Sequence, residues 1–234
     1  MRAILKREFR AYFQSPLGYV FFSAMFFFSG YYFFTYNLYG STTNMTKLFE
    51  LLFPVVLFLV PVLTMRLLSE EKRLGTDQLL LTAPVSRTAI VVGKYLAAVA
   101  VFCIAIAATL LQAVVMSLFA WPDWPVIIGN FTGLLLLGVT LIAICLFLSS
   151  LTESQLVAAI LGFVVSLFLM LIDALAVVVS GDLLRSILRG LSFGDRYTPF
   201  TIGVLELPNV IFFLSTSFLF LALTVVMLDK ERWS

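Results

Sequence analysis

The segment Met65–Lys94 has the sequence MRLLSEEKRLGTDQLLLTAPVSRTAIVVGK and lies between two long apolar runs. It begins with charges of both signs and carries cations again toward its end. The leucines after Gly75 predict a short helix that ends before Pro84, and apolar side chains that face water need a partner or a membrane to cover them. The segment therefore predicts a docking surface; the alternative is a loop whose charges only orient the chain in a membrane.

The composition of the chain indicates a membrane protein. Hydrophobic residues make up 62 % of the 234 residues, charged residues make up 12 %, and the mean hydropathy is +1.08. Water is not the solvent for most of a surface with this composition. We expect residues 1–234 to form a single transmembrane domain without a soluble domain.

Few side chains are suited to catalysis or to metal binding. The chain contains no histidine, and its two cysteines, Cys103 and Cys145, lie within apolar runs. Because histidine is the commonest metal ligand and general base, we expect no metal site, no disulfide framework and no enzyme. The net charge of +2 is too small to indicate binding of nucleic acid.

Six apolar runs are long enough to cross a membrane as helices. They extend over residues 17–39, 51–68, 95–120, 126–152, 156–179 and 207–228. Gly129, Gly133 and Gly138 in the fourth run are positions at which helices can pack closely. The predicted fold class is all-α, a polytopic membrane protein with six transmembrane helices.

Residues 1–16 form a separate element before the first span. In a helical projection Lys6, Arg7 and Arg10 lie opposite an apolar face, and the dipeptide Ser15-Pro16 is expected to end the helix. This pattern predicts an amphipathic interfacial helix with its cations among lipid phosphates. Glu8 falls on the apolar side and does not fit the pattern. The alternative is a cationic flank that only fixes the topology.

The distribution of cations predicts the orientation of the chain. Eleven of the 15 lysines and arginines lie in the N-terminal arm, in the segment after the second span and in the C-terminal tail, and four lie on the other side. Cytoplasmic loops of membrane proteins carry the excess of positive charge. Both termini are therefore predicted to be cytoplasmic.

The segment 180–206 between the fifth and sixth spans is then extracellular. Apolar residues from Leu183 to Leu191 recur at helical spacing with Arg185 and Arg189 on another face, which predicts a short amphipathic helix. This helix is either a lid packed on the bundle or a gate. Asp173, near the end of the fifth run, is either an interfacial residue that caps or pairs, or a residue that faces a substrate.

The string Glu70–Ala97, EEKRLGTDQLLLTAPVSRTAIVVGKYLA, resembles the loop after the second span in type-two ABC exporter permeases. The positions that match are Glu71, Gly75, Thr76, Leu80, Pro84, Ser86, Arg87, Gly93 and Lys94. In this family six spans follow an amphipathic N-terminal helix, and the resemblance covers essentially the whole chain. The ending Leu207–Trp233 is similar to the gliding-motility-associated permease subgroup, although Thr201-Ile202-Gly203 departs from it by lacking a cation.

The resemblance implies that residues 69–90 are a cytoplasmic coupling loop that docks on a separate ATPase subunit. Charge pairs set the register of such an interface, and apolar residues anchor it. The expected contacts are Glu70, Glu71, Lys72, Arg73, Asp77, Leu79, Leu80, Leu81 and Arg87. Gly93-Lys94 lacks the glycine that a phosphate-binding loop requires five residues earlier, where Thr88 stands, so we expect no nucleotide site in this chain.

The predicted function is that of the transmembrane subunit of an ATP-driven ABC exporter in a prokaryotic plasma membrane. ATP and Mg²⁺ are expected on the partner ATPase, and no cofactor is expected in this chain. The other expected partners are membrane lipid and a second permease subunit, identical or homologous, with the substrate path between the two. The alternatives are an ion-coupled secondary transporter, which needs ionisable groups near the membrane midplane, and a non-transporting membrane scaffold.

Overall fold

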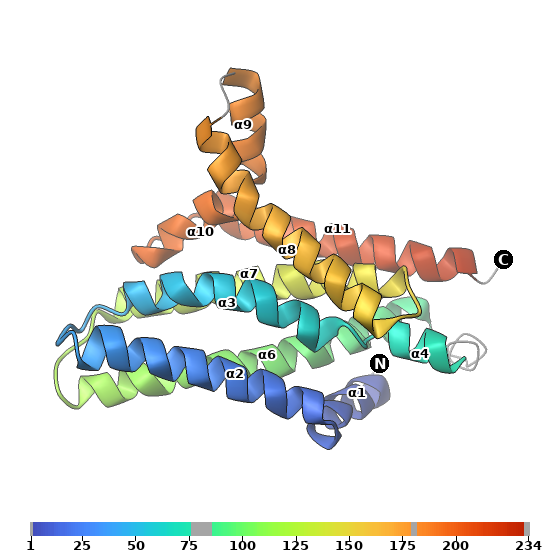
Figure 1. The fold of residues 1–234 in the computed structure, drawn as a ribbon, viewed down its shortest axis with the longest axis horizontal. Coiled ribbons are helices and arrows are strands. Elements are labelled where there is room, and N and C mark those ends of the chain that lie inside the picture. The colour runs from blue at the N-terminus through green and yellow to red at the C-terminus, as the bar shows by residue number, and fades with distance from the viewer. Residues whose placement is uncertain (1, 76–85, 179–181, 232–234) are drawn as a thin grey trace.

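A computed structural model describes residues 2–75, 86–178 and 182–231 of the chain. The described residues form helices joined by short connections, and no strand occurs among them. Figure 1 shows the helices stacked into a bundle, with α1, α4 and the C-terminal end of α11 at one end and α10 near the other. We call the first of these the α1–α4 end.

Within these described ranges, six helical stretches are long and apolar enough to cross a membrane: Pro16–Leu38, Thr46–Leu74, Arg87–Ser117, Trp124–Ser150, Gln155–Ile172 and Leu207–Lys230. They correspond to α2 (Pro16–Tyr32) with the π-helical turn η1 (Phe33–Leu38), α3 (Thr46–Thr64) with α4 (Ser69–Leu74), α6 (Arg87–Ser117), α7 (Trp124–Ser150), α8 (Gln155–Val178) and α11 (Leu207–Glu231). The predicted all-α fold with six spans is confirmed. Each predicted span overlaps one of these stretches, since apolar length is a local property of the sequence.

The helix α7 is the centre of the bundle and packs against α3, α6, α8, α10 and α11. Its three glycines permit this packing, as the sequence predicts. A Cβ atom on Gly138 would lie 2.1 Å from Cε1 of Phe102 in α6, and one on Gly133 would lie 2.6 Å from Cβ of Phe200 in α10. Neighbouring helices therefore approach α7 more closely than any larger residue would allow.

The first helix, α1 (Arg2–Gln14), is separate from the first span. It ends before Ser15, and α2 begins at Pro16, which is the predicted position of the break. Proline lacks a backbone N–H and is tolerated at the first position of a helix. The helix α1 packs against α6 and α2, with Tyr12 buried.

Two helices lie between the fifth and sixth spans. The helix α9 (Asp182–Leu191) covers the predicted amphipathic stretch, and α10 (Phe193–Thr201) follows it. Figure 1 shows α8 diverging from the bundle toward α9, whereas α10 returns to it. The helix α10 was not predicted; it packs on α7 through the buried side chains of Tyr197 and Phe200. The side chain of Asp173 lies outside the described part of the structure.

Candidate functional site: a buried charge cluster at the α1–α4 end

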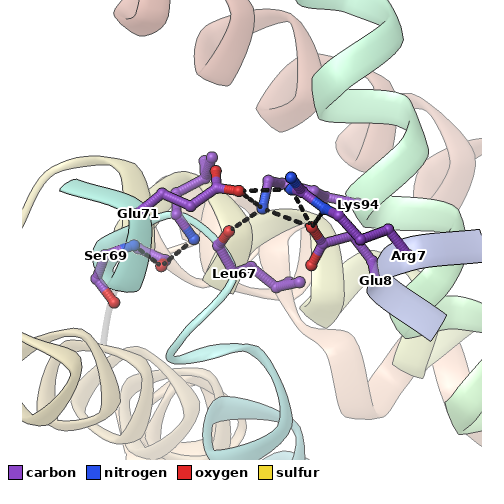
Figure 2. Close-up of polar contacts among 8 residues, drawn as sticks. Arg7, Glu8, Leu67, Ser69, Glu71 and Lys94 are labelled. Carbon is purple, nitrogen blue, oxygen red and sulfur yellow. Dashed lines mark hydrogen bonds and ion pairs between the residues drawn. The ribbon is translucent and has the colours of Figure 1, made fainter. Parts of the chain in front are cut away.

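A lysine is buried among the helices at the α1–α4 end. The side chain of Lys94, in α6, is 1 % exposed. Its Nζ lies 2.9 Å from Oε1 of Glu71 in α4 and 3.2 Å from Oε1 of Glu8 in α1, and it donates a hydrogen bond of 2.7 Å to the carbonyl of Leu67 (Figure 2). A buried ammonium group is stable only when charges and hydrogen bonds replace its water. Two carboxylates and a carbonyl fill that role here.

The same two carboxylates also bind an arginine. The guanidinium of Arg7 lies 2.6 Å from Oε1 of Glu8 and 2.7 Å from Oε1 of Glu71 (Figure 2). Arg7, Glu8, Glu71 and Lys94 thus form a cluster of two cations and two anions, which we call the charge cluster. Because its members come from α1, α4 and α6, it joins elements that are far apart in sequence.

The charge cluster explains why Glu8 does not fit the amphipathic pattern of α1. Glu8 lies on the face of α1 that packs on the protein, where Lys94 neutralises it. Burial favours the neutral acid and is the largest influence on the group, but Lys94 and Arg7 together outweigh it and hold the pKa of Glu8 below its ordinary value of 4.5. Glu8 is therefore ionised at neutral pH.

Tyr12 provides a second attachment of α1. Its hydroxyl donates a hydrogen bond of 3.0 Å to the carbonyl of Leu63 near the end of α3, and the guanidinium of Arg66 lies 4.8 Å from the centre of its ring. Burial raises the pKa of Tyr12, so its hydroxyl remains a neutral donor. The helix α1 is thus attached to α3 as well as to α4 and α6.

The short helix α4 is attached to the end of α7. Oγ of Ser149 accepts hydrogen bonds from the backbone N–H groups of Leu68 and Ser69, at 3.2 and 3.1 Å, and donates one of 3.1 Å to the carbonyl of Met65. Lys72 donates to the carbonyl of Ser150 in the last turn of α7. These bonds satisfy free backbone N–H groups at the start of α4 and a free carbonyl at the end of α7. Gly75, with φ of 65°, ends α4 in the left-handed conformation.

The predicted coupling residues fall into three groups. Glu71, Lys72 and Arg87 have partners within the chain, Arg87 pairing with Asp229 near the end of α11. Glu70 is half-buried, Arg73 is exposed, and Leu74 beside them is 61 % exposed. The remaining predicted contacts, Asp77, Leu79, Leu80 and Leu81, lie outside the described residues.

The predicted interfacial cations fall into two groups. Lys6 and Arg10 are exposed, whereas Arg7 belongs to the charge cluster. Glu8, Asp229 and Ser149 were not predicted as site residues, and Lys94 was predicted only as a position that matches the family. One feature of the sequence could have indicated the pair: Glu8 and Lys94 have opposite charges, and each lies on an apolar face of its own helix.

Comparison with known proteins gives the family. A search of the curated proteins finds no match. The family model described as "ABC-2 family transporter protein" matches residues 2–229, which is nearly the whole chain. With six helices long and apolar enough to span a bilayer, the chain is a multi-pass membrane protein. It belongs to the ABC-2 family of transporter proteins and is a permease of that family.

Proposed function

We propose that this permease is the transmembrane subunit of an ATP-driven exporter and that its α1–α4 end receives the movement of a separate ATPase subunit. Membrane subunits of this family are generally not enzymes, so ATP and Mg²⁺ belong to that partner. The observation that carries the proposal is the position of Lys94. It connects α4, the helix that begins the coupling loop, to a membrane span, α6.

The exposed side of α4 supplies a surface for the ATPase subunit. Arg73 and Leu74 are exposed there and Glu70 is half-buried, next to the part of the coupling loop that holds the other predicted contacts. Charged groups at such a surface set register, and an exposed leucine provides an anchor. Glu71 and Lys72 have a different role, since their side chains bind α6, α1 and α7.

A push on α4 then reaches the spans through direct contacts. Glu71 in α4 contacts Lys94 in α6 and Arg7 in α1, and Glu8 in α1 also contacts Lys94. A displacement of α4 therefore acts on both α6 and α1. Packed helices respond to such a force as rigid bodies that shift between discrete arrangements. In this mechanism α1, α4 and the start of α6 move together.

The remaining parts of the proposal concern the assembly. The cations at the α1–α4 end favour a cytoplasmic position for both termini, in a prokaryotic plasma membrane. A second permease subunit, identical or homologous, would complete the substrate path, and exposed apolar side chains on α2, α8 and α11 leave surface for it and for lipid. The similarity of the last span to the gliding-motility-associated subgroup supports membership of that subgroup.

The proposal is tested by co-purification with a co-expressed ABC ATPase subunit. The variant Glu70→Ala/Arg73→Ala/Leu74→Ala changes side chains on α4 that do not belong to the charge cluster. Its matched control, Asp195→Ala/Arg189→Ala/Leu205→Ala, changes one acid, one arginine and one leucine that are exposed in the segment between α8 and α11. We expect the first variant to lose the ATPase subunit and the control to retain it.

A third variant separates docking from transmission. Glu71→Gln weakens the charge cluster but leaves the exposed surface of α4, so the ATPase subunit should bind while its hydrolysis is no longer stimulated by the permease. Equal binding and stimulation in all three variants would exclude α4 as the docking element.

A further inference from the structure

Three exposed cations form a stripe along α1. Arg2, Lys6 and Arg10 are spaced by four residues, which places them on one side of the helix, and all three are exposed. No ion pair joins them to any residue in the described ranges, whereas Arg7 on the same helix is held by Glu8 and Glu71. The stripe therefore presents positive charge to the surroundings of the protein.

A row of aromatic rings begins beside this stripe and continues along the first span. The ring centres of Phe9 and Phe13 are 5.1 Å apart, those of Phe13 and Phe22 are 5.6 Å apart, and those of Phe22 and Phe26 are 6.4 Å apart. Phe13 and Phe26 are 36 % and 48 % exposed. The row thus crosses from α1 to α2 and presents an apolar surface along a membrane-spanning helix.

The stripe and the row meet at Phe13. This residue follows Arg2 by about three helical turns and Lys6 by about two, so it lies on the same side of α1 as the stripe, just past its last cation. A ligand that touches both features needs a negative charge at one end and a long apolar part that extends into the membrane. A lipid with an anionic headgroup has this chemistry.

We infer that the junction of α1 and α2 binds an acidic phospholipid, with its phosphate on Lys6 and Arg10 and an acyl chain along Phe13, Phe22 and Phe26. A lipid is favoured over the acidic surface of a soluble protein because the aromatic row follows α2 along a helix that spans the bilayer, where a soluble protein cannot follow. The inference depends on the membrane-spanning character of α2 and not on the proposed function.

Native mass spectrometry of the detergent-solubilised protein tests this inference. The probes are phosphatidylglycerol and phosphatidylcholine with the same acyl chains. The variant Lys6→Gln/Arg10→Gln should bind phosphatidylglycerol roughly thirtyfold more weakly than the wild type, because each cation near a membrane surface contributes to the attraction of anionic lipid. Its affinity for phosphatidylcholine should change little.

The matched control is Arg73→Gln/Lys230→Gln, which removes two exposed cations from the same end of the protein but not from α1. It should retain the affinity for phosphatidylglycerol. An exchange variant, Lys6→Arg/Arg10→Lys, keeps the charge and should bind like the wild type. Glutamine is a good helix former, and both replaced side chains are exposed, so the Tm of the double variant should equal that of the wild type.

A second pair of probes tests the aromatic row. Phe13→Ala/Phe26→Ala should lose most of the preference for long-chain over short-chain phosphatidylglycerol, and glycerol phosphate should not displace the long-chain lipid from the wild type. Displacement by glycerol phosphate would indicate an anion site without a lipid chain and would overturn the inference.

Other outcomes would also overturn it. Equal affinity of the wild type and Lys6→Gln/Arg10→Gln would exclude the stripe, and an equal loss in the Arg73/Lys230 control would indicate a nonspecific effect of net charge. If the stripe variant bound phosphatidylglycerol normally but lost the ATPase subunit, the stripe would be a protein-docking surface. The α4 variants described above test the proposed function separately.

Discussion

At the scale of single residues, Lys94 combines complete burial with a full charge. An exposed ion pair contributes little to stability, but removing one member of a buried pair leaves an uncompensated charge in an apolar environment. Glu8 and Glu71 are 14 % and 16 % exposed, so water replaces Lys94 poorly. The charge cluster therefore depends on Lys94 more than on Arg7, which is 54 % exposed.

We predict that Lys94→Met lowers the free energy of unfolding by about 3 kcal/mol. Chemical denaturation in detergent, followed by circular dichroism, measures this change. The variant Lys94→Met/Glu71→Gln, which also removes one of the orphaned carboxylates, should regain part of the loss. An unchanged midpoint for Lys94→Met would show that the cluster does not stabilise the protein.

The attachment of α1 should depend on pH through Glu8. Because the pKa of Glu8 is lower in the folded protein than in the unfolded chain, its contribution is present at neutral pH and is lost as the pH falls through the lowered pKa. We expect limited proteolysis to cleave α1 faster below about pH 4 than at pH 7. Glu8→Gln should show the faster cleavage at pH 7 already, and identical pH profiles for both proteins would contradict this assignment.

At the scale of helices, close packing between α6 and α7 depends on Gly138. A Cβ atom there would lie 2.1 Å from Cε1 of Phe102, whose side chain is fully buried, so the ring would have to shift. We predict that Gly138→Ala lowers stability by about 1 to 3 kcal/mol. Gly30→Ala is the matched control, since a Cβ atom at Gly30 in α2 meets nothing within 4 Å. Equal Tm values for the two variants would contradict the close approach.

The presence of the long helices could be predicted, whereas that of α10 could not. A run of some twenty apolar residues forms a helix in a bilayer whatever its neighbours are, because the backbone has no water to bind. The helix α10 has nine residues and contains Pro199, so its local preference for helix is weak. It is stabilised by contacts with distant residues: Asn130 donates a hydrogen bond of 3.0 Å to the carbonyl of Thr201, and Phe200 packs against Gly133.

At the scale of the whole molecule, the α1–α4 end gathers the N-terminal helix α1, the short helix α4 and the end of α11 (Figure 1). The ion pair between Arg87 and Asp229 ties the start of α6 to the end of α11 at this same end. A cytoplasmic partner that binds here can therefore reach several spans at once. The orientation of the bundle in the membrane decides whether that partner has access.

Labelling of single cysteines tests the orientation. In a background in which Cys103 and Cys145 are replaced by alanine, Arg73→Cys and Lys230→Cys should react with a membrane-impermeant maleimide only after the cells are opened. Lys47→Cys, at the start of α3 and hence at the opposite end of the bundle, should react in intact cells. The reverse pattern would place both termini outside.

The sequence alone was sufficient for the membrane class, the six spans, the break at Ser15-Pro16 and the resemblance to a permease family. These depend on composition, apolar length and motifs, which are contained in neighbouring residues. Which charged residues pair with one another was decided only by the tertiary structure. Glu8, Glu71 and Lys94 are distant along the chain and meet only when α1, α4 and α6 pack together, because the energy that pairs them arises from burial in the assembled bundle.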